Sequence, residues 1–221
     1  MKKRIYIAIP NYTGNLHWHV VKSLMYMLMH EYKRKEQELI CEIVPRMRAP
    51  RVRNYIGHQM LKCDATHLLT IDDDHIFQHD ALERLMAHDK DIVGALAFLR
   101  SEDNSTSLAP SMYQRGRIQP PGYKTHDQWQ FGDLVEVDAM GMAMVLIKRH
   151  VLETVAPPWW WLGPTPEEPL GEDFYFCWRA QQAGFKLYVD TALEVPHLSE
   201  PILLHSDMWR QERENGTLRS A

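Results

Sequence analysis

The nine residues HLLTIDDDH, from His67 to His75, decide the fold more than any other stretch of the sequence. The first five form an apolar, β-branched run of strand length, and three consecutive aspartates follow it. Ligands of open α/β sheets bind at the carboxyl ends of strands, and a hard divalent cation neutralises adjacent carboxylates that otherwise repel one another. The alternative is an acidic turn that caps the next helix, but one Asp is enough for a cap, and Asp80 stands directly before that helix. The stretch therefore predicts a buried strand that ends in a metal site.

Strands and helices alternate around this stretch. Short β-branched runs predict the strands, and apolar residues at helical spacing predict the helices between them. The predicted strands are Arg4–Ile9, Ile40–Val44, His67–Ile71 and Asp91–Phe98, and the predicted helices lie around Leu16–Leu28, Val52–Leu61 and Ala81–His88. Such alternation is typical of a mostly parallel sheet that is flanked by helices. The predicted fold class is therefore α/β.

The second half of the chain is less regular. A stretch rich in Ser, Asn, Pro, Gly and Gln, Ser101–Gly132, is too long for a plain connector and is interpreted as a functional loop or a small hairpin insertion. Further strands are predicted at Leu134–Val137, Met142–Ile147, Phe185–Val189 and Ala192–Val195, with helices at Arg149–Val155 and Asp173–Ala183. From Ser199 onward the sequence is polar and weakly patterned.

Composition excludes several classes of protein. The 221 residues are 45% hydrophobic and 24% charged, which is typical of a globular chain and excludes a disordered or fibrous one. A net charge of -4 gives no footprint for a dedicated nucleic-acid binder. The apolar run Ile5–Ile9 is too short for a signal peptide or a membrane span, so we expect no transmembrane segment and a cytoplasmic location. Cys41, Cys63 and Cys177 have no C-x-x-C spacing and are interpreted as reduced packing residues.

The length predicts one domain over residues 1–199, followed by a tail at 200–221. We find no internal repeat.

Five short motifs then follow one another in a recognisable order. They are an opening strand ending in Pro10 and Tyr12, a helix beginning with Arg53 and Asn54, the run Asp72–Asp74, the segment Met140–Met142 with its Gly141, and the triplet Gly171–Asp173. In this order, over roughly Ile5–His197, the chain resembles the nucleotide-sugar site of the GT-A glycosyltransferases, most closely family 2. The resemblance implies a GT-A, Rossmann-like fold, with a nucleotide-binding half over residues 1–99 and a smaller acceptor-side half over residues 100–199.

The resemblance also implies a donor site and a metal. The donor would be a nucleoside-diphosphate sugar, held by Pro10, Tyr12, Arg53, Asp72, Asp73 and Gly141. Asp72 would hold the ribose and help to bind the metal, Asp74 would bridge to the metal, and His197 would be a third ligand. Such ligands suit Mn²⁺ or Mg²⁺, with imidazole favouring Mn²⁺ slightly. For a lone histidine, an ordinary surface or core position is the alternative.

The resemblance assigns catalysis to the acidic pair Glu172 and Asp173. By the resemblance Asp173 would take the proton of the attacking hydroxyl in an inverting reaction, with Glu172 orienting the acceptor. Alternatively, both carboxylates only complement a helix dipole at its N-terminus. Arg51 and Arg53 are candidates for contacts with the donor phosphates, or else belong to a solvated helix face.

Aromatic residues are candidates for an acceptor platform. Trp159, Trp160 and Trp161 precede the acidic pair, and Trp129 lies in the irregular stretch, so that their rings could stack on sugar rings. Hydrophobic packing of the loop is the alternative.

The chain departs from the family after Val44. The segment Pro45–Arg48 contains no acidic residue that could hold the nucleobase of the donor, so the identity of that nucleobase stays open.

These residues together predict a metal-dependent glycosyltransferase with a carbohydrate or other hydroxyl acceptor. The alternative is a non-catalytic carbohydrate- or nucleotide-binding module of the same fold. A nucleotidyltransferase is disfavoured because the loop Asn11–Asn15 has one glycine and no lysine. A phosphohydrolase based on His79 and Asp80 lacks a convincing set of partners.

Overall fold

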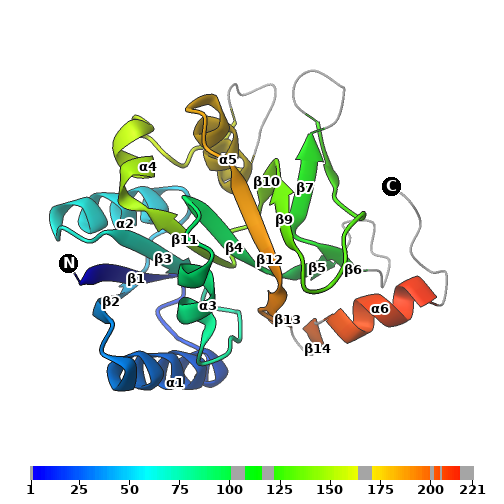
Figure 1. The fold of residues 1–221 in the computed structure, drawn as a ribbon, viewed down its shortest axis with the longest axis horizontal. Helices are drawn as coiled ribbons and strands as arrows, with labels where there is room; N and C mark the ends of the chain where they lie inside the picture. The colour runs from blue at the N-terminus through cyan, green and yellow to red at the C-terminus, as the bar shows by residue number, and fades with distance from the viewer. Residues whose placement is uncertain are drawn as a thin grey trace.

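The structure is a computed structural model, which describes residues 2–100, 108–115, 122–163, 171–199, 202–204 and 206–214. Seven strands of this described part form one twisted sheet in the order β2-β1-β3-β11-β4-β12-β9 (Figure 1). Their bounds are β1 Lys3–Asn11, β2 Gln37–Pro45, β3 His67–Ile71, β4 Ile92–Leu96, β9 Leu134–Val137, β11 Met144–Lys148 and β12 Leu187–Glu194. Only β11 and β9 run antiparallel to their neighbours. The prediction of a mostly parallel α/β sheet is therefore confirmed.

Helices cover both faces of the sheet. The helices are α1 Trp18–Arg34, α2 Arg51–Lys62, α3 Ala81–Ala87, α4 Arg149–Thr154, α5 Glu172–Gln182 and α6 Ser206–Glu214. In the buried strand β1, Tyr6 and Ala8 pack with α2, α4 and α5, whereas Ile5 and Ile7 pack with α1 and α3. Because successive side chains of a strand point to opposite faces, the apolar run that starts the chain fills two separate cores.

The irregular stretch contributes smaller antiparallel sheets. Strands β7 Met112–Arg115 and β8 Tyr123–Thr125 form a hairpin that continues to β10 Ala139–Met140. Strand β5 Phe98–Arg100 pairs with β6 Leu108–Pro110, and β13 His197–Ser199 pairs with β14 Ile202–Leu204. Of the two interpretations of Ser101–Gly132, the described parts favour the hairpin insertion; residues 101–107 and 116–121 lie outside the described residues. The predicted strand Asp91–Phe98 is interrupted after Leu96, and the two strands predicted between Phe185 and Val195 are the single strand β12.

The chain beyond Ser199 contains a helix that the sequence pattern did not indicate. Trp209 of α6 is 4% exposed, and its ring stacks on Trp129 at a centroid distance of 5.0 Å. Phe98 lies 5.7 Å from the same ring. One large aromatic side chain therefore anchors an otherwise polar helix to the core.

Trp159 and Trp160 are also core residues, which corrects their assignment to an acceptor platform. Each is 1% exposed. The side chain of Asn54 holds this segment, since its Oδ1 accepts from the Trp159 backbone N–H at 2.9 Å and its Nδ2 donates to the Trp160 carbonyl at 2.7 Å. Trp160 stacks on Phe176, and Trp159 packs so closely on Gly57 that a Cβ there would lie 2.9 Å from its ring. Neither indole is therefore accessible to a sugar, whereas Trp161 is 54% exposed.

Candidate functional site

The three aspartates after β3 have three different sets of partners. The Asp72 backbone N–H donates to the Ala143 carbonyl at 2.9 Å, which fixes the start of the loop beside β11. Asn11, at the end of β1, donates from its side chain to Asp73 at 2.8 Å. Asp74 turns toward two histidines, described below. Separating the carboxylates among different partners lowers their mutual repulsion.

Arg53 connects residues that the sequence placed in separate motifs. This arginine of α2 is 6% exposed, and its Nη2 lies 3.0 Å from Oδ1 of Asp72. Its Nε lies 3.4 Å from Oδ1 of Asp173 and 3.8 Å from Oε1 of Glu172. A buried guanidinium without carboxylates would be strongly destabilising, so the four side chains form one electrostatic unit. Arg53 therefore joins the acidic run after β3 to the acidic pair at the start of α5.

Asp173 is a largely buried carboxylate with a raised pKa. Burial raises its pKa to about 7, and the nearby charges of Asp72 and Glu172 also raise it. The guanidinium of Arg53 and the backbone N–H of Met142, which donates to Oδ2 at 3.2 Å, oppose that shift in the pKa. The side chain keeps 24% of its surface exposed, although its Oδ1 atom is buried. A carboxylate with a pKa near 7 accepts a proton far more readily than an ordinary one.

Gly141 lies between Ser111 and this carboxylate. A Cβ at Gly141 would collide with the hydroxyl oxygen of Ser111 and would lie 3.9 Å from Oδ2 of Asp173. Glycine is favoured at this position because the side chain of Ser111 fills the space that a Cβ would occupy.

We expect Gly141→Ala to lower the free energy of unfolding by about 1–3 kcal/mol, the usual cost of overpacking a buried site. The double variant Gly141→Ala/Ser111→Ala should recover most of this loss, because it removes the oxygen that the new methyl group meets. Chemical denaturation of both variants measures the effect. If the double variant were as unstable as the single one, the collision with Ser111 would not be its cause.

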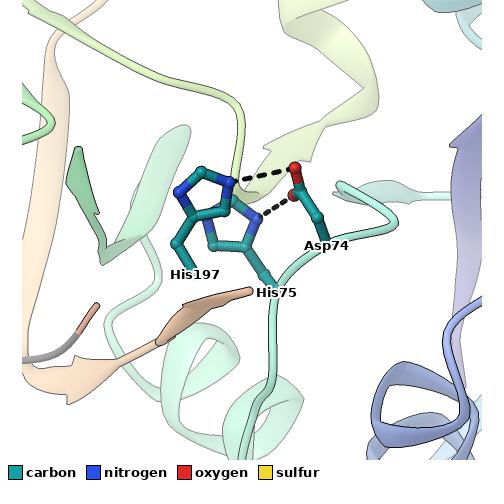
Figure 2. Close-up of side chains that lie close together, drawn as sticks. All are labelled: Asp74, His75 and His197. Atoms are coloured by element: carbon teal, nitrogen blue, oxygen red, sulfur yellow. Dashed lines mark hydrogen bonds and ion pairs between the residues drawn. The ribbon is translucent and has the colours of Figure 1, made fainter. Parts of the chain in front are cut away.

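Asp74, His75 and His197 form the second part of the site (Figure 2). The Leu198 N–H donates to the Asp74 carbonyl at 2.6 Å, and His75 and His197 form an antiparallel bridge. These backbone contacts bring His197 to Asp74, from 123 residues away, with its Nε2 at 3.1 Å from Oδ2. Nδ1 of His75 lies 2.6 Å from Oδ1 of Asp74, and the two imidazole rings stack at 4.8 Å. One ligand atom from each residue falls within 4.8 Å of the others.

The polar atoms of this cluster fit a metal ion. His75 is 4% exposed, yet neither of its ring nitrogens makes an aligned hydrogen bond within the described part of the chain. The same holds for Oδ1 of Asp74 and Nδ1 of His197. Burial alone would raise the pKa of Asp74, but the two histidines lower it below its usual value, so the carboxylate is charged. Two imidazoles and a carboxylate with unsatisfied atoms are a suitable donor set for a divalent transition metal.

The cluster differs from the predicted ligand set by one exchange: it contains His75 in place of Asp72. Asp74 and His197 lie together as expected, and His75 joins them although it was not predicted as a ligand. Its position directly after three aspartates was the available signal. Asp72 is not in the cluster and lies with Arg53 instead, so its contact with metal stays a prediction.

The remaining donor candidates lie near the end of β1 and the start of α2. Tyr12 is 51% exposed, and the guanidinium of Arg48 lies 4.4 Å above its ring and donates to its hydroxyl at 2.8 Å. Pro10 lies within β1 one residue before Asn11, and Arg51 is exposed at the first position of α2. Their contacts with a nucleotide stay predictions.

Trp161 borders a groove of about 430 Å³. The other lining residues are Pro158, Gly163, Tyr175, Trp178 and Arg179. The acceptor role of Trp161 stays a prediction, and this groove is where an acceptor could contact it.

The comparisons with known proteins concern the fold. No family model matches the sequence, and no match was found among curated proteins. Among solved structures, A197 from STIV is 20% identical with a TM-score of 0.58, covering 93% of this chain and 91% of that one. An apo UDP-glucose pyrophosphorylase is 7% identical with a TM-score of 0.50, covering 98% and 99%. S. aureus TarS 1–349 is 13% identical with a TM-score of 0.47, covering 86% and 59%.

These similarities confirm a GT-A-like fold, which nucleotidyltransferases share, and do not single out family 2. No helix in the described ranges is long and apolar enough to cross a membrane.

Proposed function

We propose that this chain is a metal-dependent glycosyltransferase that moves a sugar from a nucleoside diphosphate to a hydroxyl acceptor with inversion. The observation that carries the proposal is that the loop after β3 connects the Asp74 cluster with the carboxylate of Asp173. The cluster of Asp74, His75 and His197 begins two residues after Asp72, and Asp72 shares Arg53 with Asp173, whose pKa is about 7. Donor activation and proton removal are the two requirements of this reaction.

Each residue has a defined task in the proposed reaction. The acceptor oxygen forms a bond to the anomeric carbon while the bond from that carbon to the diphosphate oxygen breaks. Asp173 accepts the proton of the acceptor hydroxyl, and Glu172 positions that hydroxyl. Arg53 holds Asp173 and Asp72 in place through its ion pairs. Mn²⁺ or Mg²⁺, bound by Asp74, His75 and His197, would offset the charge that develops on the leaving diphosphate.

A nucleotidyltransferase is the second candidate, because UDP-glucose pyrophosphorylase has a similar fold. That reaction uses a nucleoside triphosphate and a sugar phosphate and needs cationic groups around the triphosphate. The loop Asn11–Asn15 supplies no lysine and one glycine, so the glycosyltransferase is favoured. A non-catalytic binding module is disfavoured because Asp173 and the Asp74 cluster are both intact.

Product analysis separates these candidates. The protein is incubated with a panel of sugar nucleotides and Mn²⁺, with and without simple sugar acceptors, and the nucleotides are separated by chromatography. We expect slow release of a nucleoside diphosphate from one donor, which also identifies the base. Conversion of a nucleoside triphosphate and a sugar 1-phosphate into a sugar nucleotide and pyrophosphate would show the nucleotidyltransferase instead. Donor binding without any product would show the binding module.

A further inference from the structure

Helix α1 has two apolar faces, one of which packs against the sheet and α3, while the other is exposed in the described part of the chain. The inner face is buried against the sheet and α3 and contains Val20, Leu24 and Met27. On the opposite side, large apolar side chains recur at helical spacing with exposed fractions between 37% and 78%, namely Trp18, Val21, Met25, Met29 and Tyr32. We call these five residues the outer stripe of α1. At 100° per residue, they fall on one narrow side of the helix, opposite the core.

The outer stripe lies at the edge of the molecule. Figure 1 shows α1 at the lower boundary of the fold, with α3 and the sheet on its inner side. Solitary exposed hydrophobic residues are ordinary, but a contiguous row over four helical turns marks an interaction surface. The row also cannot be explained by helix formation, since polar residues form helices equally well at exposed positions.

The charges beside the stripe have one sign. Lys22 and Lys33 are exposed next to it, and Lys22 lies over the ring of Tyr26 at 5.7 Å. The only carboxylate of α1, Glu31, is 2% exposed and pairs with Arg34 on the inner side. The outward side of this 17-residue helix therefore offers apolar, aromatic and positive groups, and no negative one.

We propose that the outer stripe of α1 rests on the anionic surface of a lipid bilayer, with the helix lying in the plane of the interface. Such helices insert an apolar face at the boundary of headgroups and acyl chains, while lysines contact anionic headgroups. Tryptophan and tyrosine favour this boundary, because their rings are apolar at one end and polar at the other. A contact between two copies of the stripe is disfavoured, because it would bring lysines together with no carboxylate to offset them. The inference does not depend on the proposed reaction.

Vesicle flotation of the full chain tests the proposal. We expect the protein to float with vesicles of mixed phosphatidylcholine and phosphatidylglycerol, and to stay in solution with vesicles of phosphatidylcholine alone. Lys22→Gln/Lys33→Gln should weaken partitioning by roughly tenfold or more, since each lysine near an anionic surface contributes about 1 kcal/mol. Met25→Gln/Met29→Gln should abolish flotation. Both double variants should keep the wild-type circular dichroism spectrum, because their side chains do not pack in the core.

A matched control is Ile43→Thr, which removes a 44% exposed apolar side chain from the edge strand β2 and should float like the wild type. Fluorescence of Trp18, taken as the difference between wild type and Trp18→Phe, should shift to shorter wavelength only with anionic vesicles. Three results would overturn the proposal: no flotation with either vesicle, equal flotation of the methionine double variant, or a dimer in sedimentation that this variant dissociates. The last would assign the stripe to a second copy of the chain.

Discussion

Replacing Asp173 with Asn should reduce the turnover number by at least about a hundredfold, the usual consequence of losing a general base. Asn keeps the size of the side chain and can still accept from the Met142 backbone N–H, but it cannot take a proton from the acceptor. Donor affinity should change little, because the substitution leaves the Asp74 cluster intact. Steady-state kinetics with the donor found in the panel, together with donor titration, measures the two quantities separately.

The pH dependence provides a second readout of Asp173. Its pKa of about 7 means that the base is protonated below neutrality, so turnover of the wild type should rise as pH increases through about 7. Stability should move in the opposite direction. Because the raised pKa lets the folded state hold a proton that the unfolded chain releases near 3.8, stability falls as pH rises between 3.8 and about 7. In Asp173→Asn, the free energy of unfolding should fall less steeply between these two pH values.

Glu172→Gln is the matched control for this prediction. It removes a charge from the same cluster around Arg53, so a purely electrostatic or structural effect should be similar in both variants. An orienting role predicts instead that Glu172→Gln raises KM for the acceptor more than it lowers kcat. If Asp173→Asn kept near-normal turnover while Glu172→Gln were inactive, the two roles would be reversed. If both remained active, the carboxylates would serve only the helix dipole.

The second large effect concerns the metal. Asp74→Ala should weaken Mn²⁺ binding by at least about a hundredfold, because loss of an inner ligand exceeds the 10–100-fold cost of losing a supporting residue. His75→Ala should weaken it as strongly as His197→Ala, although only His197 was expected as a ligand from the sequence. Both histidine variants should lose less than Asp74→Ala, since they keep the carboxylate. Electron paramagnetic resonance of free Mn²⁺ during titration gives each affinity without any substrate.

The same three side chains predict which metal binds more tightly. Two imidazoles favour Mn²⁺ over Mg²⁺, whose preferred ligands are oxygens. Mg²⁺ should therefore compete poorly with Mn²⁺ in the titration. Glu153→Gln, a surface carboxylate of α4, is the control and should bind Mn²⁺ like the wild type. Unchanged Mn²⁺ affinity in His75→Ala would remove this residue from the site, even if Asp74 and His197 remained ligands.

Local sequence pattern was sufficient for most of the sheet. The strand β3 matches His67–Ile71 at both ends, because a fully buried strand needs an unbroken apolar and β-branched run and its end is marked by charged residues. Helix α2 was similarly recognisable, since Val52, Ile56 and Met60 recur at helical spacing and are all buried. The ends of this strand and the buried face of this helix depend on residues close in the sequence, so the local pattern predicts them.

Features that depend on distant neighbours were harder to predict. The proposed ligand role of His75 rests on backbone pairing with His197, which no local period encodes. Trp159 and Trp160 were assigned to a sugar because they precede the acidic pair and aromatic rings stack on sugars, but Asn54 and Gly57 of α2 create the space that buries them. Helix α6 is mostly polar, and the buried ring of Trp209 packs against the distant residues Phe98 and Trp129.

The central claim is that the metal held by Asp74, His75 and His197 binds the diphosphate of the donor. Calorimetric titration of the nucleoside diphosphate released in the panel tests this claim most directly, with wild type and Asp74→Ala each measured with Mn²⁺ and after metal removal with EDTA. We expect tight binding only for the wild type with Mn²⁺, and weak, equal binding in the other three cases. Binding by the wild type that is unaffected by EDTA, or by Asp74→Ala that is as tight as the wild type with Mn²⁺, would contradict the claim.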